Sequence, residues 1–142
     1  MTPEQWKQVK HFHPSENWGD PEKMDANLIF GLDALRDFVG LPITIHCGWE
    51  KRNKGFHPDG IAADLHIEGI SAFDQFIAAQ RFSVFTGIGI YPRWTNFLTG
   101  EKWPGVHLDT RPLFQNEPRA LWGCLKPGYY DKVGKHFLMA SI

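Results

Sequence analysis

The sequence predicts an α+β domain built on a central antiparallel sheet with helices packed on one face. Two observations support this prediction: apolar residues recur at helical spacing before residue 41, and they alternate at strand spacing in most segments after residue 42. Because helices come first and strands later, the strands are expected to pair with one another as an antiparallel sheet. With 142 residues, the chain is expected to form a single domain over 1–142.

Three helices are predicted from capping residues that precede apolar residues at helical spacing. The first, over 3–11, begins with a Thr-Pro-x-Gln capping box. The second is expected to start after Asp20, which can act as N-cap, and to stop at Gly40. The third is expected to start at Ser71.

Four segments alternate apolar and polar residues and are predicted to be strands: 43–48, 61–67, 83–91 and 106–110. The tail, over 121–137, is expected to add one or two short strands around a Pro-Gly turn at 127–128.

Composition and charge exclude several classes of protein. Fifteen Lys and Arg against 16 Asp and Glu give a net charge of −1, which argues against nucleic acid as the main partner. No apolar run is long enough to span a bilayer. The N-terminus lacks the features of a signal peptide, so we expect synthesis in the cytoplasm without a leader. We also expect a monomer with two reduced cysteines.

One face of the predicted sheet gathers ionisable side chains. Alternation places the following residues away from the helices: His46, Asp64, His66, His107 and Asp109. Cys47 is expected on the opposite, apolar face, while the glycines at 87 and 89 are expected to leave space for a cleft floor. Imidazoles and carboxylates are natural zinc ligands, so the face is suited to a divalent cation. The alternative is a polar sheet surface without metal.

A local motif sharpens this interpretation. Residues 57–64 read H-x-x-G-x-A-x-D, and a later strand carries a further His at 107. This combination resembles the zinc D-alanyl-D-alanine carboxypeptidases and phage endolysin peptidases of peptidoglycan, whose fold is shared with the Hedgehog signalling domain. Segments 12–41, 87–92 and 106–110 are also similar to that family, so the resemblance covers about 12–111.

The resemblance implies a zinc ion, Zn2+, bound by His57, Asp64 and His107. Three protein ligands leave the fourth tetrahedral position open for water, as in catalytic zinc sites. The implied activity is hydrolysis of amide bonds in the stem or cross-link peptides of peptidoglycan, by an endopeptidase or a carboxypeptidase. Without a leader, such an enzyme would reach the cell wall by release at lysis, as a phage lysin does.

Two stretches depart from the family pattern. A Ser-Gly-Tyr-Arg-like stretch is replaced by Cys-Gly-Trp-Glu at 47–50, so Lys51 or Arg52 is the expected substitute for the substrate-binding Arg. The Glu or Asp that family members carry three residues before the last His is replaced by proline at 104. Asp109 is therefore the first candidate for the general base and Glu101 the second. The same departures fit an alternative, a module that keeps zinc but has lost catalysis and acts in wall binding or structure.

Further substrate-binding candidates flank the proposed site. Arg111 is expected to hold either a neighbouring carboxylate or a substrate carboxylate, and His46 to contact substrate or a metal ligand. Trp49, Trp94 and Trp103 are expected either to wall a groove for a glycopeptide or to anchor long loops.

Overall fold

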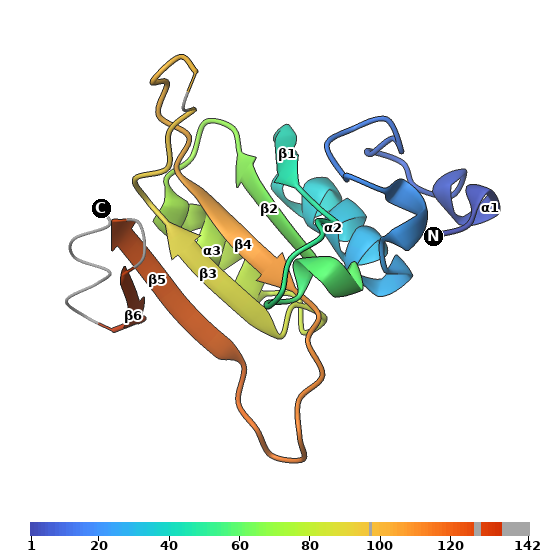
Figure 1. Cartoon of the computed structure of the whole chain (residues 1–142). Helices are drawn as coiled ribbons and strands as arrows, with labels where there is room; N and C mark the ends of the chain where they lie inside the picture. Colours follow the sequence, from blue (N-terminus) through green and yellow to red (C-terminus); the bar gives the residue numbers. More distant parts are fainter. Residues whose placement is uncertain (97, 127–128, 135–142) are drawn as a thin grey trace.

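The computed structural model describes residues 1–96, 98–126 and 129–134, and over these residues the chain is α+β with a six-stranded mixed sheet (Figure 1). The strands are β1 (Ile43–Cys47), β2 (Ala62–Ile67), β3 (Gly87–Tyr91), β4 (Gly105–Asp109), β5 (Ala120–Lys126) and β6 (Tyr129–Lys132). Their order across the sheet is β1-β2-β4-β3-β5-β6. The helices are α1 (Pro3–Trp6), α2 (Ala26–Val39) and α3 (Ala72–Gln80), with single 3-10 turns η1 (Pro21–Lys23) and η2 (His57–Asp59).

The sheet is not wholly antiparallel, and on this point the prediction was wrong. Strand β5 runs parallel to β3, whereas the other neighbouring pairs are antiparallel. After β4 the chain makes a long excursion and returns to the same end of the sheet at which β3 starts (Figure 1). There the Ala120 N–H donates to the Thr86 carbonyl at 2.9 Å, which starts the parallel pairing. Such a return depends on distant contacts, which local alternation does not encode.

The tail was predicted to add one or two short strands, and it adds two, β5 and β6, which pair with each other in antiparallel fashion. The predicted Pro-Gly turn at 127–128 and the end of the predicted segment, 135–137, lie outside the described residues.

Helix α1 is shorter than predicted. Its capping box is present, but the helix ends at Trp6 rather than at His11. The next residues turn away because the backbone N–H groups of Lys10 and His11 donate to the Asp33 carboxylate, at 3.0 and 2.8 Å. A tertiary contact with α2 therefore replaces the last predicted helical turn.

The second predicted helix is divided in two. Asp20 caps only η1, Met24 is extended, and Asp25 caps α2, which ends at Gly40 as predicted. This division allows a contact with a distant loop: the Asp25 backbone N–H donates to the Gly60 carbonyl at 2.8 Å and holds the loop that follows η2. Helix α3 begins immediately after its predicted N-cap, Ser71.

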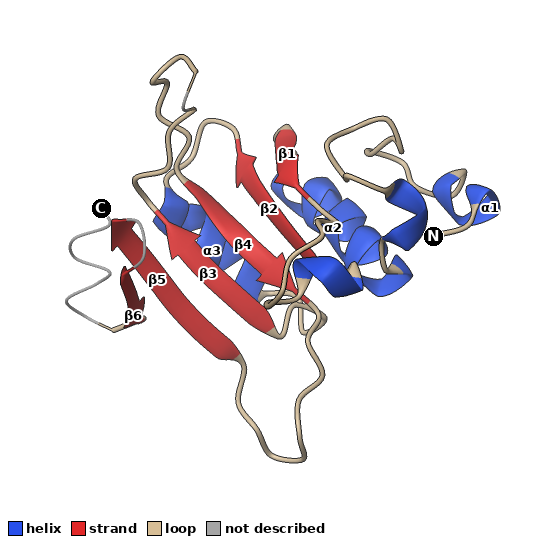
Figure 2. Ribbon diagram, viewed as in Figure 1, coloured by secondary structure: helices blue, strands red, loops and turns tan. Residues whose placement is uncertain are grey.

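The hydrophobic core lies between the sheet and the two longer helices, which share one face of the sheet (Figure 2). Residues on this side are almost fully buried and include Leu28, Leu32, Ile45, Leu65, Ile88 and Leu108. The opposite face of the sheet is not covered by these helices (Figure 2). Within the described part of the chain, no helix has the length and apolar character needed to cross a membrane.

Candidate metal centre

One row of side chains crosses the face that lies away from the helices. Backbone pairing aligns Cys47, Asp64, His107, Gly89 and Trp122 on five neighbouring strands. The predicted ligands Asp64 and His107 are thus direct cross-strand partners on β2 and β4. These two residues are far apart in the sequence but adjacent in space, because β2 and β4 lie side by side in the middle of the sheet.

His57 is brought to this row by the loop between β1 and β2. Gly60 closes η2 with φ 72°, and a side chain at this position would overlap the backbone of η1. The Trp49 indole N–H donates to the Pro58 carbonyl at 3.0 Å, which fixes the turn from the other side. Trp49, a predicted substrate-binding residue, therefore anchors the loop that carries His57.

Asp64 lies between two imidazoles. His57 Nε2 is 3.4 Å from Asp64 Oδ2, and His107 Nδ1 is 2.9 Å from Asp64 Oδ1. His57 Nδ1 donates to the Gly48 carbonyl at 2.6 Å, which leaves Nε2 directed at the carboxylate. This outer hydrogen bond orients His57 as metal-binding histidines are usually oriented. The structure thus brings together the three residues predicted as metal ligands.

Cys47 joins the centre, although the sequence predicted it on the apolar face. A β-bulge between Ile45 and Cys47 breaks the alternation of β1, so that Cys47 pairs with Asp64. Its Sγ lies 3.7 Å from His57 Nδ1. Both cysteines are free thiols, as predicted. A bulge is invisible to a period-two pattern, which explains why sequence reasoning missed this residue.

The structure also identifies the most compact set of potential metal ligands among the described residues. The ligand atoms of Cys47, His57 and Asp64 all lie within 4.8 Å of one another. His107 is outside this set but contacts Asp64 from the opposite side. Sulfur, nitrogen and carboxylate oxygen together form a donor set that zinc commonly takes in proteins. The centre could therefore hold a metal ion.

Hydrogen bonds with carboxylates favour protonation of the two imidazoles of the centre. Burial disfavours charge on His57, but hydrogen bonds with Asp64 and Cys47 outweigh it and raise the pKa of His57 to about 10. Burial likewise opposes charge on His107, yet hydrogen bonds with Asp109 and Asp64 raise the pKa of His107. Burial alone would raise the pKa of Asp64, but its hydrogen bonds with His107 and His57 lower it. A cation that binds here must displace these imidazole protons.

Asp109, the first predicted general base, has a different part in the structure. Its side chain is fully buried and accepts two hydrogen bonds from the Arg111 guanidinium, at 2.7 and 2.9 Å. It also bonds His107 Nε2 at 2.8 Å. Burial opposes its ionisation, but these partners lower the pKa of Asp109 to about 2. With both oxygens engaged, Asp109 positions His107 instead of facing a substrate.

Arg111 holds the neighbouring carboxylate, which is the first of the two roles expected for it. Its guanidinium forms the fork on Asp109 and also lies over the rings of Phe56 and Trp122, 4.5 and 4.9 Å from their centroids. These contacts occupy both the edge and the faces of the guanidinium. Arg111 therefore supports the centre indirectly, because it holds Asp109, which in turn holds His107.

Of three further predicted site residues, Arg52 reaches the centre, whereas Glu101 and Lys51 do not. Glu101 is exposed and lines a cavity with His66 and Glu68 rather than with Asp64. Lys51 is exposed, with no contact to the centre among its described interactions. Arg52 does reach the rim, where Nη2 lies 3.7 Å from Cys47 Sγ.

Glu50 is a rim residue that sequence reasoning did not select. Its carboxylate pairs with Arg52, and Oε2 lies 3.9 Å from Cys47 Sγ. Half of its side chain is exposed, so it can exchange protons with solvent. Its signal in the sequence is its position, since it stands where the family pattern carries the Arg.

An aromatic-walled cavity of about 440 Å³ opens beside Asp64. Trp94 and Trp103 lie on the two sides of the loop between β3 and β4. The backbone N–H of Trp103 donates to the backbone carbonyl of Trp94 at 2.8 Å. The Trp103 ring stacks on His46, with centroids 4.8 Å apart. His46 in turn bonds His66 at 2.7 Å, and burial with this neighbour lowers the pKa of His46 to about 4. The wall beside Asp64 is therefore neutral and aromatic.

The predicted cleft floor at the two glycines of β3 is filled, which corrects that prediction. A side chain at Gly87 would collide with the Asp109 carboxylate, and one at Gly89 would lie 2.6 Å from the Trp122 ring. The absence of side chains on β3 thus makes room for the positioning carboxylate and an indole. Open space lies instead on the β1 side of Asp64.

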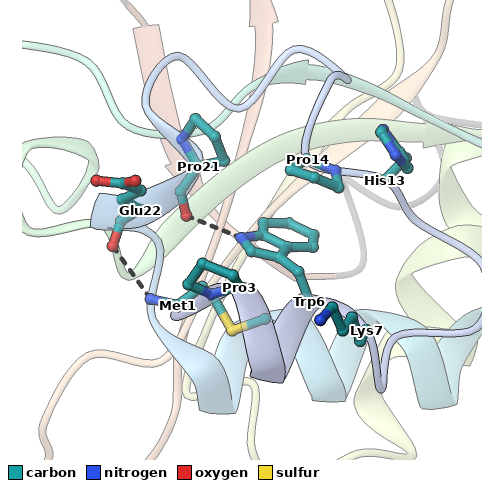
Figure 3. Close-up of a pocket in the computed structure, with 8 residues that line it drawn as sticks. All are labelled: Met1, Pro3, Trp6, Lys7, His13, Pro14, Pro21 and Glu22. Atoms are coloured by element: carbon teal, nitrogen blue, oxygen red, sulfur yellow. Dashed lines mark hydrogen bonds between the residues drawn. The ribbon is translucent and has the colours of Figure 1, made fainter.

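A separate cavity of about 350 Å³ lies near the N-terminus (Figure 3). Its wall includes Met1, Pro3, Trp6, Pro14 and Pro21, with Lys7, His13 and Glu22 at the edge. The Trp6 indole donates to the Pro21 carbonyl at 3.2 Å across one side. None of these residues belongs to the metal centre, and they bring no cluster of catalytic groups together.

Comparison with known proteins finds no matching protein-family model and no matching curated protein. Any proposal about the function of this protein therefore rests on the residues of the centre and their geometry.

Proposed function

We propose that the protein is a zinc-dependent peptidase that hydrolyses amide bonds in peptidoglycan peptides, like the carboxypeptidases and endolysin peptidases that its sequence resembles. One observation carries the proposal. The motif residues His57 and Asp64 lie against His107, which comes from a strand far along the chain. These are the residues to which the resemblance assigns the metal.

Zinc is the metal that the donor set favours. Thiolate sulfur and imidazole nitrogen disfavour magnesium and calcium, which prefer sites built from oxygen alone. A zinc ion in this centre would supply a Lewis acid that polarises the scissile carbonyl and lowers the pKa of water. The chain itself supplies the orientation of the ligands, through the Gly48 carbonyl behind His57 and Asp109 behind His107.

The aromatic-walled cavity is the proposed place for the substrate. It reaches Asp64 on one side and is walled by His46, Trp94 and Trp103 on the other. Flat aromatic surfaces suit the apolar face of a sugar ring or an aliphatic side chain, and glycopeptides carry both. His46, a predicted substrate-binding residue, contributes a neutral imidazole to this wall.

Glu50 is the proposed general base, in place of Asp109 and Glu101. Its carboxylate lies at the rim beside Cys47 and remains half-exposed, so it can take a proton from attacking water and return it to the leaving amine. Arg52 holds Glu50 through an ion pair and presents positive charge beside the centre. This pair takes over the roles that the family pattern gives to an Arg after the first strand and an acid before the last His.

Release of soluble muropeptides from purified sacculi tests the proposal. We expect His57→Ala to abolish release by zinc-loaded protein, because it removes a ligand. Glu50→Gln should lower kcat by about 10²- to 10⁴-fold, the usual loss for a general base. His13→Ala is the matched control, since His13 is exposed and lies in the separate N-terminal cavity.

Full release by His57→Ala would contradict the metal assignment. No release by the zinc-loaded wild-type protein or by a zinc-loaded Cys47→Ser variant would contradict hydrolysis and favour the second candidate function, a zinc module without catalysis. One observation favours that candidate: Cys47, His57, Asp64 and His107 together offer four donors, the number found in closed structural zinc sites.

A further inference from the structure

We propose that Cys47 is a ligand of the metal and fills the coordination position that hydrolysis needs for water, so that the resting centre is closed. The inference rests on the proposed zinc centre and concerns how that centre is controlled. His57, Asp64 and His107 leave one tetrahedral position free, and Cys47 is the residue placed to occupy it.

The position of Cys47 is built by the fold. The bulge in β1 turns its side chain towards Asp64, and the ligand atoms of Cys47, His57 and Asp64 lie within 4.8 Å of one another. Bulges are placed next to functional sites because they re-aim a side chain. Without the bulge, Cys47 would have continued the apolar face of Ile43 and Ile45.

The surroundings of the sulfur suit a ligand rather than a buried thiol. Arg52 Nη2 lies 3.7 Å from Sγ, so negative charge on the sulfur has a cation beside it. On the other side, the Cys47 thiol donates to the Glu50 carboxylate, with Sγ 3.9 Å from Oε2. Cys47 is partly exposed, so small reagents can reach it from solvent.

Cys124 shows the contrast within the same chain. It lies on β5, is buried, and its thiol donates to the Lys126 carbonyl at 2.8 Å. It has no place in the metal group found among the described residues. Cys124→Ser is therefore a matched control for Cys47→Ser.

The test uses cobalt(II) in place of zinc, because thiolate bound to cobalt gives an intense near-ultraviolet charge-transfer band. We expect this band in the wild-type protein and in Cys124→Ser, and its absence in Cys47→Ser. We expect Cys47→Ser to weaken zinc binding by more than the roughly 10- to 100-fold loss that follows removal of an outer partner. Release of muropeptides by zinc-loaded Cys47→Ser should exceed that of the wild type, because the water position is open.

A second measurement does not depend on any variant. Zinc should slow the alkylation of Cys47 by iodoacetamide in the wild-type protein, as followed by peptide mass spectrometry, and should not change the reaction of Cys124. Equal rates of Cys47 alkylation with and without zinc would overturn the inference.

The outcomes separate this inference from the proposed function. Cobalt binding without the band, combined with hydrolysis, would overturn the role of Cys47 and leave the peptidase standing. The band without hydrolysis by the wild type or by Cys47→Ser would support Cys47 as a ligand and overturn the peptidase. Failure of the wild type to bind cobalt or zinc would overturn both.

Discussion

Leu65 and Asp64 are neighbours in the chain, yet they lie on opposite faces of β2 in opposite chemical surroundings. Leu65 is fully buried among the apolar residues under the helices, whereas Asp64 lies between two imidazoles on the other face. Both faces are covered near the middle of the sheet, since all five residues of β4 are buried. The ionisable face is therefore not simply the solvated side of an antiparallel sheet.

This difference separates stability from chemistry. Burial of apolar surface stabilises the fold directly, whereas burial of charged groups costs free energy unless partners compensate it. On the ionisable face, compensation comes from chains of contacts such as Arg111 to Asp109 to His107. Such an arrangement is hard to explain as a means of stabilising the protein and is easily explained as a site kept ready for a ligand.

The largest expected effects come from substituting these two neighbours. Asp64→Asn should abolish stoichiometric zinc binding, because it replaces the carboxylate shared by both imidazoles. Leu65→Ala should lower the free energy of unfolding of the metal-free protein by about 2–5 kcal/mol and leave zinc affinity nearly unchanged. Titration calorimetry and urea unfolding measure the two quantities. Wild-type zinc affinity in Asp64→Asn would break the division between the faces.

Arg111→Gln should produce a mixed effect, because Arg111 compensates a fully buried carboxylate. Removing one partner of a buried ion pair typically costs about 3–5 kcal/mol, so the free energy of unfolding should fall. Looser support of His107 through Asp109 should weaken zinc binding by about 10- to 100-fold. Arg93→Gln, at an exposed position, is the control. Unchanged zinc affinity in Arg111→Gln would show that Arg111 does not support His107 through Asp109.

The last expected effect is a pH dependence of the metal-free protein. Because the pKa of His57 is raised to about 10 from an ordinary value of 6.5, its contribution to stability is complete below pH 6.5 and is lost as pH rises towards 10. The Tm of the metal-free protein should therefore fall over that range, while the increase in Tm caused by zinc grows.

Scanning calorimetry with and without a chelator measures both trends. Asp64→Asn is the control, since it removes the hydrogen bond that raises the pKa of His57. A Tm that stays constant from pH 6.5 to 10 in the metal-free wild type would argue against a proton shared between His57 and Asp64.

Features of the site that depend on nearest neighbours could be predicted from the sequence. Alternation placed Asp64 and His107 on one face, because side chains of a regular strand point to opposite faces in turn. The capping box at Thr2 and the stop at Gly40 also follow from local hydrogen bonding and backbone conformation. The motif over 57–64 pointed to metal ligands only through its resemblance to a known family.

Only the tertiary structure decided the remaining features. The bulge that delivers Cys47, the parallel pairing of β5, and the contact of His107 with Asp64 each depend on which segments meet in space. A single inserted residue reverses the face of every later side chain in a strand, and the local sequence does not specify such an insertion. The sequence alone therefore placed Asp64, His107 and Asp109 on one face, because alternation is local. Packing between distant segments added Cys47 to that face and decided which of these residues touch.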